Sequence, residues 1–324
     1  MANQRKINGP MLADHFLADL GGTKTQQLLS RLNQLIPWDQ LALQILPLYR
    51  NDDGRGGRPN VPVVMMLKCI LLQKWFNLSD SGVEEAVADR ISFRKFLNLG
   101  LSDQGVDETT LVKFRKRLRE AGIIGELFDT ATHYLTSQGL ILKQGTMVDA
   151  TIIAAPRGKA TEDGLDSTKD KTASFTRKNG QTHHGYKAHI ATDENGMIKD
   201  YVFDTAKVHD TKHFDQLTEN EYHEVFADSA YMDKQRREKL ESRGIFCGII
   251  ERRVRGQGEL AASQKAHNRL CATFRAAVEH PFAWIKSMMG YRKVRYRGAR
   301  RNGEDFGFTA MAYNFKRSLS LIGT

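Results

Sequence analysis

The sequence is poor in the features that mark secreted, disulfide-bonded and membrane-spanning proteins. Its three cysteines, Cys69, Cys247 and Cys271, are scattered and include no CxxC pair, which argues against a disulfide framework or a zinc knuckle. The longest apolar stretch, residues 61–72, is interrupted by Lys68 and is too short to cross a bilayer. The first ten residues lack the apolar core of a signal peptide. These absences predict a cytoplasmic protein with no membrane partner.

A nucleotide-binding phosphate loop is also missing. The glycine-rich stretch at residues 51–60 (NDDGRGGRPN) is not followed by Lys-Ser or Lys-Thr at the required offset. Hydrophobic residues make up 40% of the 324 residues, which is enough for a core and argues against wholesale disorder. The length is that of one large domain or two ordinary ones.

Positive charge is confined to one end of the chain. Residues 251–324 hold 15 Lys/Arg and 5 Asp/Glu, whereas residues 1–250 hold 33 of each, so the whole excess of +10 lies in the last 74 residues. A confined excess indicates a surface for a polyanion. The alternative is a basic tail without a specific partner.

The N-terminal part of the chain has helical patterning and no strand signal. Apolar residues recur at helical spacing, Ser81 and Glu84 have the form of a capping box, and Asp107 can cap a helix that ends before Gly122. The predicted helices are residues 24–35, 39–48, 62–76, 81–89, 108–121 and 123–137. We expect a helical N-terminal segment over residues 1–58 and a helical DNA-binding or dimerisation domain over residues 59–139.

The pattern changes to alternating strands and helices from residue 140 onward. The predicted strands are residues 141–153, with an apolar run over residues 147–153, and residues 183–191, 197–205, 223–228 and 244–250. The predicted helices are residues 212–217, 234–242 and 261–290, and residues 155–182 are predicted to form a long polar loop. This order indicates an α/β domain over residues 140–324, built on a mixed five-stranded sheet with helices on its faces.

The long helix places three charged residues in line. At about 100° per residue, Arg275, Glu279 and Lys286 fall within an arc of about 40°. The apolar residues are expected on the opposite side of the helix; they are Leu270, Phe274, Ala277, Val278, Pro281, Trp284, Ile285 and Met288. The alternative interpretation is a solvated face with ordinary Arg–Glu pairing.

Two aspartates belong to the predicted strands. Asp149 lies inside an apolar strand, where a carboxylate is costly to bury unless it is paired or bound to a metal. Asp228 ends another strand, where it could also simply cap the helix that follows. Together with a carboxylate from the long helix, the two would form an oxygen-ligand site for Mg²⁺ or Mn²⁺. Two such ions at ~4 Å can catalyse phosphoryl transfer.

Four sequence motifs, in their order along the chain, resemble those of a known enzyme family. VDATI, GYKAHIATDENG, FADSAY and the run from Arg275 through Glu279 to Lys286 are similar to the DDE transposases of bacterial insertion sequences, specifically the insertion-sequence-five family. The last run matches the family's signature of Tyr, two residues, Arg, three residues, Glu, six residues and Lys, except that Ala272 occupies the tyrosine position. The resemblance spans residues 55–315 and includes the helical half.

The resemblance implies an RNase H-like catalytic domain in which Asp149, Asp228 and Glu279 hold two Mg²⁺ or Mn²⁺ ions. Arg275 and Lys286 would contact phosphates of double-stranded DNA near the scissile bond. The implied activity is cleavage at the terminal inverted repeats and joining of the 3′-hydroxyl to target DNA. The protein would be bacterial, nucleoid-associated when on DNA, and a homodimer or higher synaptic oligomer. Alternatives are a transposase-derived DNA-binding protein without catalysis and a Mg²⁺-dependent nuclease of the same fold.

Further DNA contacts are predicted from local composition. Lys187 could point toward substrate or lie on the surface, and Tyr231 could stack near DNA or pack in the core. Residues 291–301 form a basic run with two interleaved tyrosines; its candidate contacts are Arg292, Lys293, Arg295, Arg297, Arg300 and Arg301. In the helical half the candidates are Lys113, Arg115 and Lys116, the alternative being a solvated face above buried Leu111, Phe114 and Leu118. A histidine-bound zinc or nickel site over residues 183–213 has little support.

Overall fold

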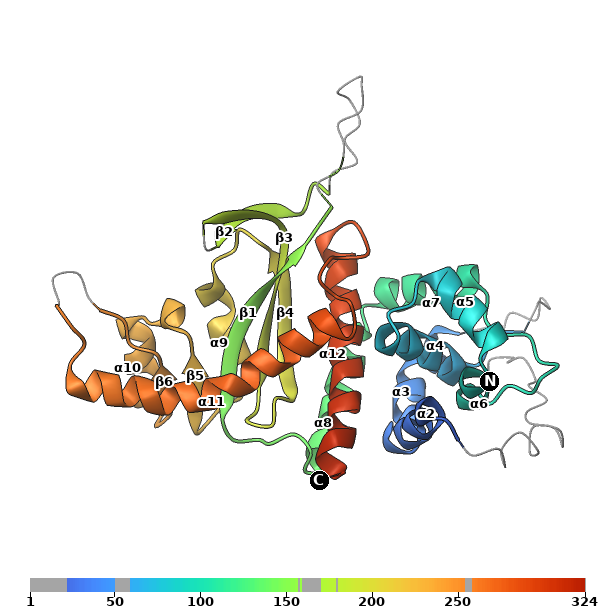
Figure 1. Cartoon of the computed structure of the whole chain (residues 1–324), viewed down its shortest axis with the longest axis horizontal. Coiled ribbons are helices and arrows are strands. Elements are labelled where there is room, and N and C mark those ends of the chain that lie inside the picture. The colour runs from blue at the N-terminus through green and yellow to red at the C-terminus, as the bar shows by residue number, and fades with distance from the viewer. Residues whose placement is uncertain are drawn as a thin grey trace, which may run out of the picture. The chain divides into compact units, whose positions relative to one another are not determined.

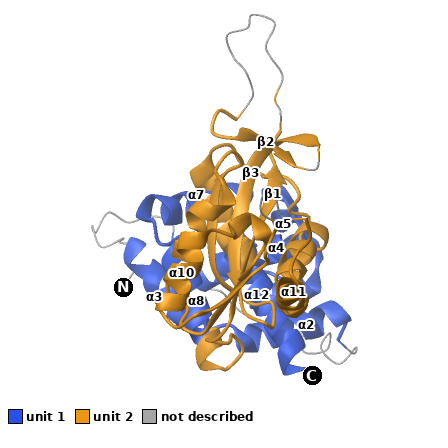
Figure 2. Ribbon diagram, turned by 90° about the vertical axis from the view of Figure 1, so that its left-hand side faces the viewer, with its two compact units in different colours: residues 1–134, 311–324 blue, residues 135–310 orange. Residues whose placement is uncertain are grey.

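The computed structural model describes residues 22–49, 59–156, 158, 170–178, 180–253 and 258–323. The chain forms two compact units, drawn in different colours in Figure 2. Unit 1 comprises Met1–Tyr134 with Met311–Thr324, and unit 2 comprises Leu135–Ala310. These units are defined by contacts within the folded chain and not by independent folding. The domain boundaries at residues 58/59 and 139/140 therefore stay predictions. No helix in the described ranges is long and apolar enough to cross a membrane.

The described residues of unit 1 form helices joined by turns and loops, and no strand, as expected. Its helices are α2 (Lys24–Leu35), α3 (Trp38–Ile45), η1 (Leu46–Leu48), α4 (Val63–Trp75), α5 (Asp80–Asp89), α6 (Ile91–Phe96), α7 (Glu108–Ala121) and α8 (Ile124–Ser137), the last of which continues into unit 2. Helix α4 is buried along nearly its whole length, as its hydrophobic sequence on all sides requires. Its Lys68 donates to the carbonyl of Phe96 at 2.7 Å, which satisfies the buried amine.

Local capping explains where two of these helices begin and end. The Asp107 side chain accepts from the Thr110 amide at 2.8 Å and Gly122 is left-handed with φ 72°, which confirms both predicted ends of α7. The capping box predicted at Ser81 is wrong by two residues. Ser79 caps α5 instead, accepting from the Gly82 amide at 2.9 Å.

Unit 2 contains a mixed six-stranded sheet (Figure 1). Its strands are β1 (Thr146–Ala154), β2 (Ser174–Lys178), β3 (Gln181–Thr192), β4 (Ile198–Thr205), β5 (Glu224–Ala227) and β6 (Phe246–Ile249). The order is β2-β3-β1-β5-β6, with β4 also paired to β3. Strand β1 is antiparallel to β3 and parallel to β5, which is parallel to β6. This arrangement confirms the predicted mixed sheet, with one strand more than the five expected.

The sixth strand, β2, corrects the prediction of a continuous loop over residues 155–182. It pairs antiparallel with β3, from Ser174 opposite Gly185 to Lys178 opposite Gln181. Its residues are half-buried or exposed, so it shows none of the hydrophobic alternation by which strands are identified. The missed signal is the Asn179-Gly180 pair between the strands, a typical hairpin turn sequence.

Helices cover both faces of the sheet. The helices of unit 2 are η2 (Asp210–His213), α9 (Phe214–Leu217), η3 (Ser229–Tyr231), α10 (Lys234–Ser242), α11 (Ala262–Ser287) and the first part of α12 (Ala299–Ile322). On one face, α9 and α10 pack over a core that includes Val148, Phe214 and Leu240. Helix α11 crosses the other face (Figure 1). There Phe274 stacks on Phe226, with 4.8 Å between the ring centres. Helix α12 was not predicted, because its buried residues surround it and leave no amphipathic pattern.

The GYKAHI motif has a steric basis in its first residue. Gly185 lies where β3 pairs with the end of β1, opposite Ala154. A Cβ at this position would lie 2.1 Å from the Ile153 carbonyl oxygen and 3.0 Å from the Ala154 Cα. Only glycine therefore allows these two strands to pair at this register.

We expect Gly185→Ala to lower the free energy of unfolding by about 3 kcal/mol, because the clash is with backbone atoms that cannot move aside. Gly258→Ala is the matched control, since a Cβ there meets nothing within 4 Å. Urea denaturation of the full chain measures both changes. Equal stability of the two variants would contradict this account of the motif.

Candidate active site

The two predicted aspartates meet where β5 ends. Strand β5 pairs with β1 only as far as Ala227 opposite Val148, and Asp149 and Asp228 are the next residues of the two strands. Beyond this point β1 has no partner on that edge among the described strands. Asp149 and Asp228 line one cavity of about 210 Å³ at the open edge. The parallel pairing of two short segments thus brings together carboxylates that are 79 residues apart in sequence.

The two carboxylates have different surroundings. Burial raises the pKa of Asp149, and the negative charge of Asp228 adds to this rise, while the Ala150 amide, Lys178 and Arg275 oppose it. Asp228 is more open, with a side chain 48% exposed and 4.0 Å from the Arg275 guanidinium. It also accepts from the Ser229 amide and caps η3. Asp228 therefore caps η3 and also lines the same cavity as Asp149.

Helix α11 supplies two cations to this region. Arg275 faces Asp228, and the Lys286 ammonium donates to the Thr151 hydroxyl at 2.6 Å. Thr151 lies two residues after Asp149 on β1, so both side chains project from the same face of the strand. Burial lowers the pKa of Lys286, and the nearby positive charges of Lys178 and Arg292 lower it further.

The orientation of α11 corrects the sequence prediction. Its buried face is formed by Cys271, Val278, Phe282 and Ile285. At about 100° per residue, Arg275 lies only about 50° from the centre of that face, and Lys286 and Glu279 follow at about 70° and 90°. The charged stripe therefore borders the buried face and does not oppose it.

This orientation explains the exposure of the residues on α11. Arg275 and Lys286 are half-buried against the sheet, whereas Glu279 is exposed. Leu270 and Met288, which were expected to be buried, are 55% and 62% exposed. Apolar residues occur on several sides of this helix. The sequence pattern therefore predicted a buried face that is rotated away from the observed one.

The expected three-carboxylate metal cluster is only partly assembled. Asp149 and Asp228 fit a divalent cation, since both are hard oxygen ligands and the half-buried Asp149 gains from added positive charge. Glu279 does not line their cavity. Asp210 does, but it is ion-paired with Lys187 at 2.8 Å. Among the described residues, no three His, Cys, Asp or Glu side chains are arranged to hold a metal ion.

The β2–β3 hairpin contributes cations that the sequence prediction missed. Arg177 and Lys178 of β2 line the cavity that contains Asp149 and Asp228. Lys178 lies near enough to Asp149 and Lys286 to affect the pKa of both. Because both cations lay in a segment predicted to be a loop, nothing in the sequence connected them to the strand aspartates.

The basic run at residues 291–301 is attached to the end of β1. The Ala154 amide donates to the Arg292 carbonyl at 3.1 Å, and the Val294 amide donates to the Ala154 carbonyl at 2.9 Å. The exposed cations of the run are Arg292, Lys293, Arg297, Arg300 and Arg301, while Arg295 is half-buried. Tyr291 is buried and packs near Phe306 at 6.0 Å, so its ring is not available to a ligand.

Three other candidate DNA contacts have structural roles. Tyr231 is 2% exposed and its ring packs near Phe214 at 5.6 Å, which excludes stacking on DNA. Arg115 is buried and ion-paired with Asp80 at 2.5 Å, so it does not reach a ligand either. Lys187 lines the cavity but is bound to Asp210.

The remaining candidates are on the outer face of α7. Lys113 and Lys116 are exposed, and Lys116 lies 3.6 Å from Glu120. Leu111, Phe114 and Leu118 are buried below them, as the alternative interpretation of this helix expected. The helix thus has an apolar inner side and exposed lysine side chains outside, of which Lys116 is paired with Glu120.

Models of known protein families match both halves of the chain. A family model described as "Transposase DDE domain" matches residues 141–315, more than half of the chain, and one described as "Transposase domain (DUF772)" matches residues 21–117.

Solved structures give a much weaker likeness. The crystal structure of the Mos1 strand transfer complex is 12% identical, covers 87% of this chain and 84% of that chain, and has a TM-score of 0.20. The Mos1 transposase paired-end complex with left transposon end is 11% identical, with coverage of 88% and 93% and a TM-score of 0.21. TM-scores of 0.20 and 0.21 are too low to support an inference about this chain.

We expect Asp149→Asn to raise the free energy of unfolding by roughly 1 kcal/mol at pH 7 in metal-free buffer, because it removes the charge of a half-buried carboxylate. Folding raises the pKa of Asp149, so the charged carboxylate destabilises the folded wild type. This loss of stability is complete above the raised pKa. It disappears as the pH falls toward about 4, the pKa of an unfolded aspartate. Denaturation at several pH values measures the difference.

The control for this change is Asp215→Asn, since Asp215 is 61% exposed and lies outside the cavity. Its effect on stability should be small at every pH. A loss of stability in Asp149→Asn at pH 7 would show that the carboxylate is held by partners that favour its charged form.

Proposed function

The chain belongs to the transposases with a DDE catalytic domain, and on this premise we propose that it cleaves DNA at transposon ends and joins the freed 3′-hydroxyl to target DNA. Enzymes of this family generally use divalent metal ions. The observation that carries the proposal is the Asp149–Asp228 pair at the end of β5, inside the matched catalytic domain. The finer assignment, to the bacterial insertion-sequence-five family, rests on the order of the sequence motifs together with the Arg275–Glu279–Lys286 spacing.

In this proposal Asp149 and Asp228 hold two Mg²⁺ or Mn²⁺ ions, with Glu279 as the third ligand. Such ions supply activation of water or a 3′-hydroxyl and stabilise the leaving oxygen. Support for Glu279 comes from its place on α11, one turn after Arg275 and on the same charged stripe. Its exposed carboxylate has no hydrogen bond or ion pair in the described part of the chain, so turning toward the pair breaks no contact.

The cations around the pair would position DNA. Arg275, Lys286 and Lys178 lie close enough to Asp149 to alter its pKa or to be altered by it, so a phosphate they bind would lie beside the carboxylates. The exposed arginines of residues 291–301 extend from the end of β1 and would hold the flanking backbone. We include Lys113 and Lys116 of unit 1 as further backbone contacts. Joining two ends requires a homodimer or a larger synaptic oligomer.

One observation favours the alternative of a transposase-derived DNA-binding protein. Glu279 lies outside the cavity of the two aspartates, and a protein that only binds DNA has no need of a third ligand. A Mg²⁺-dependent nuclease of the same fold is distinguished by strand transfer, since it would not join pre-cut ends to a second duplex.

We expect Asp149→Ala, Asp228→Ala and Glu279→Ala each to lower cleavage of end DNA at least about 100-fold, the scale on which loss of one catalytic group lowers kcat. DNA affinity should change little, because phosphate contacts come from the cations. Cleavage of a labelled duplex carrying the element's ends, with and without Mg²⁺, measures the effect.

Glu238→Ala is the matched control, since Glu238 is 61% exposed and its ion pair, with Lys234 at 3.8 Å, lies on the surface. Cleavage by Glu279→Ala at the wild-type rate would remove Glu279 from the ligand set. Binding of end DNA by the wild type without cleavage in any divalent metal would favour the DNA-binding protein.

A further inference from the structure

Thr151 of β1 holds a lysine of α11 beside the two aspartates. The Thr151 hydroxyl accepts a hydrogen bond from the Lys286 ammonium at 2.6 Å. Thr151 lines the cavity that contains Asp149 and Asp228. Its side chain projects from the same face of β1 as that of Asp149, with about 7 Å between the two Cα atoms. The hydrogen bond therefore fixes a positive charge at the border of the carboxylate cavity.

Thr151 is what fixes the Lys286 ammonium in this place. The lysine side chain is half-buried, and in the described part of the chain its ammonium has no ion pair and no hydrogen-bond acceptor other than Thr151. An ammonium has three N–H donors, so two of them remain for a ligand. A lysine loses much rotamer freedom when its end is fixed. Because the Thr151 bond already restricts the side chain, less freedom is left to lose when a ligand binds.

The charges around Lys286 favour a negatively charged ligand. Burial lowers the pKa of Lys286, the positive charges of Lys178 and Arg292 lower it further, and the carboxylate of Asp149 opposes them. The Arg292 Nε also donates to the Lys286 carbonyl at 3.3 Å, which keeps this second cation at the end of α11. Cations that are close together and half-buried are stabilised by an additional anion. A phosphate group would supply that charge.

We propose that Thr151 is a positioning residue: by holding the Lys286 ammonium beside Asp149, it directs this lysine to the phosphate that is cleaved. The identity of that phosphate as DNA rests on the proposed function, whereas the hydrogen bond and the excess of cations are properties of the structure. Thr151 does not touch the reacting atoms in this proposal. Its effect passes through Lys286 and should vanish when the lysine is removed.

Thr151→Val keeps the branched shape of the side chain and removes the acceptor. We expect cleavage of end DNA at saturating DNA to slow about 10-fold or more, the scale of one hydrogen bond to a charged group. The half-saturating DNA concentration should change by less than about threefold, because other cations hold the DNA backbone. Thr151→Ser retains the hydroxyl and should cleave within about threefold of the wild type.

A double-mutant cycle separates positioning from packing. In the Lys286→Met background, Thr151→Val should slow cleavage less than about twofold, because no ammonium remains to be held. If the hydroxyl only helped β1 to pack, Thr151→Val would slow cleavage equally in both backgrounds.

The same cycle can be measured without metal or cleavage, from binding of a fluorescent end duplex to the full chain in EDTA. Lys286→Met should reduce the slope of log K against log salt by about 0.9, the value for one phosphate contact. Thr151→Val keeps the charge, so the slope should stay the same. Its affinity should fall about threefold, and only while Lys286 is present.

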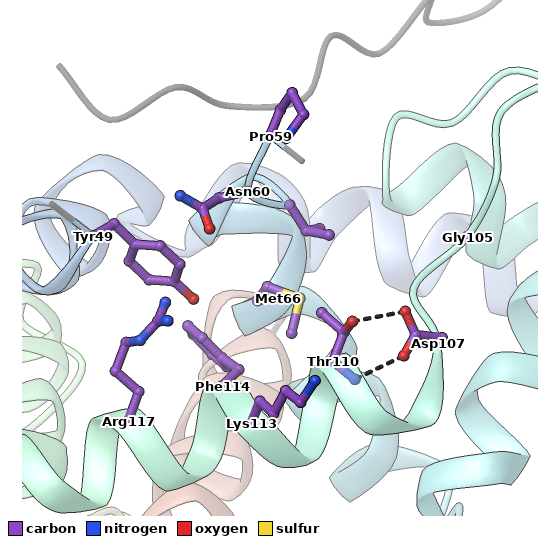
Figure 3. A pocket seen from close by; sticks show the side chains of 11 residues that line it. Tyr49, Pro59, Asn60, Met66, Gly105, Asp107, Thr110, Lys113, Phe114 and Arg117 are labelled. Carbon is purple, nitrogen blue, oxygen red and sulfur yellow. Dashed lines mark hydrogen bonds between the residues drawn. The ribbon is translucent and has the colours of Figure 1, made fainter. Parts of the chain in front are cut away.

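Thr110→Val is the matched control for a threonine with a structural hydrogen bond. Figure 3, a view of a cavity within unit 1, shows Thr110 bonded to Asp107 at the start of α7, where the Thr110 hydroxyl donates at 2.6 Å. Loss of this bond should lower the melting temperature. Its effect on DNA binding should add to that of Lys286→Met without coupling, because the two residues share no partner.

Two outcomes would overturn the inference. One is wild-type cleavage and affinity in Thr151→Val. The other is an equal loss with and without Lys286, which would make the hydroxyl a structural group only. Absence of cleavage by the wild type in every divalent metal would instead contradict the proposed function, and the cycle in EDTA would still test Thr151.

Discussion

Unit 2 is organised around the need to hold two carboxylates together in a partly buried place. Asp149 and Asp228 repel each other and Asp149 is also desolvated, so the folded chain must place positive charge nearby. That charge comes from separate elements, Lys178 from the β2–β3 hairpin and Arg275 from α11. In the proposed enzyme, metal ions would take over this neutralisation and leave the cations free to bind phosphates.

The unequal lengths of β1 and β5 produce the site. Strand β5 has four residues and β1 has nine, so β1 continues past its partner and has no strand on this edge from Asp149 until residues 292–294 bond to Ala154. The Gly185 contact fixes the register of β1 and β3 on the opposite edge. A one-residue slip would turn Asp149 to the other face of the sheet, away from α11.

Much of the fold could be predicted because strong local patterns specify it. The helix over residues 234–242 was predicted with its observed ends, and the five predicted strands all exist. Strand β2 and helix α12 were missed for opposite reasons. Strand β2 has no buried alternation and depends on pairing with β3, whereas α12 is buried on most sides. Periodicity detects only elements with one buried face.

By itself, the sequence determined the order of the carboxylates, the caps of α7 and the confinement of excess charge to residues 251–324. Each of these depends on neighbours in the chain or on composition. Tertiary structure alone decided that Arg115 is buried and ion-paired with Asp80, and that Glu279 is exposed. The reason is physical: contacts between distant segments follow from packing of whole elements, and a single sequence does not state which face of one element meets another.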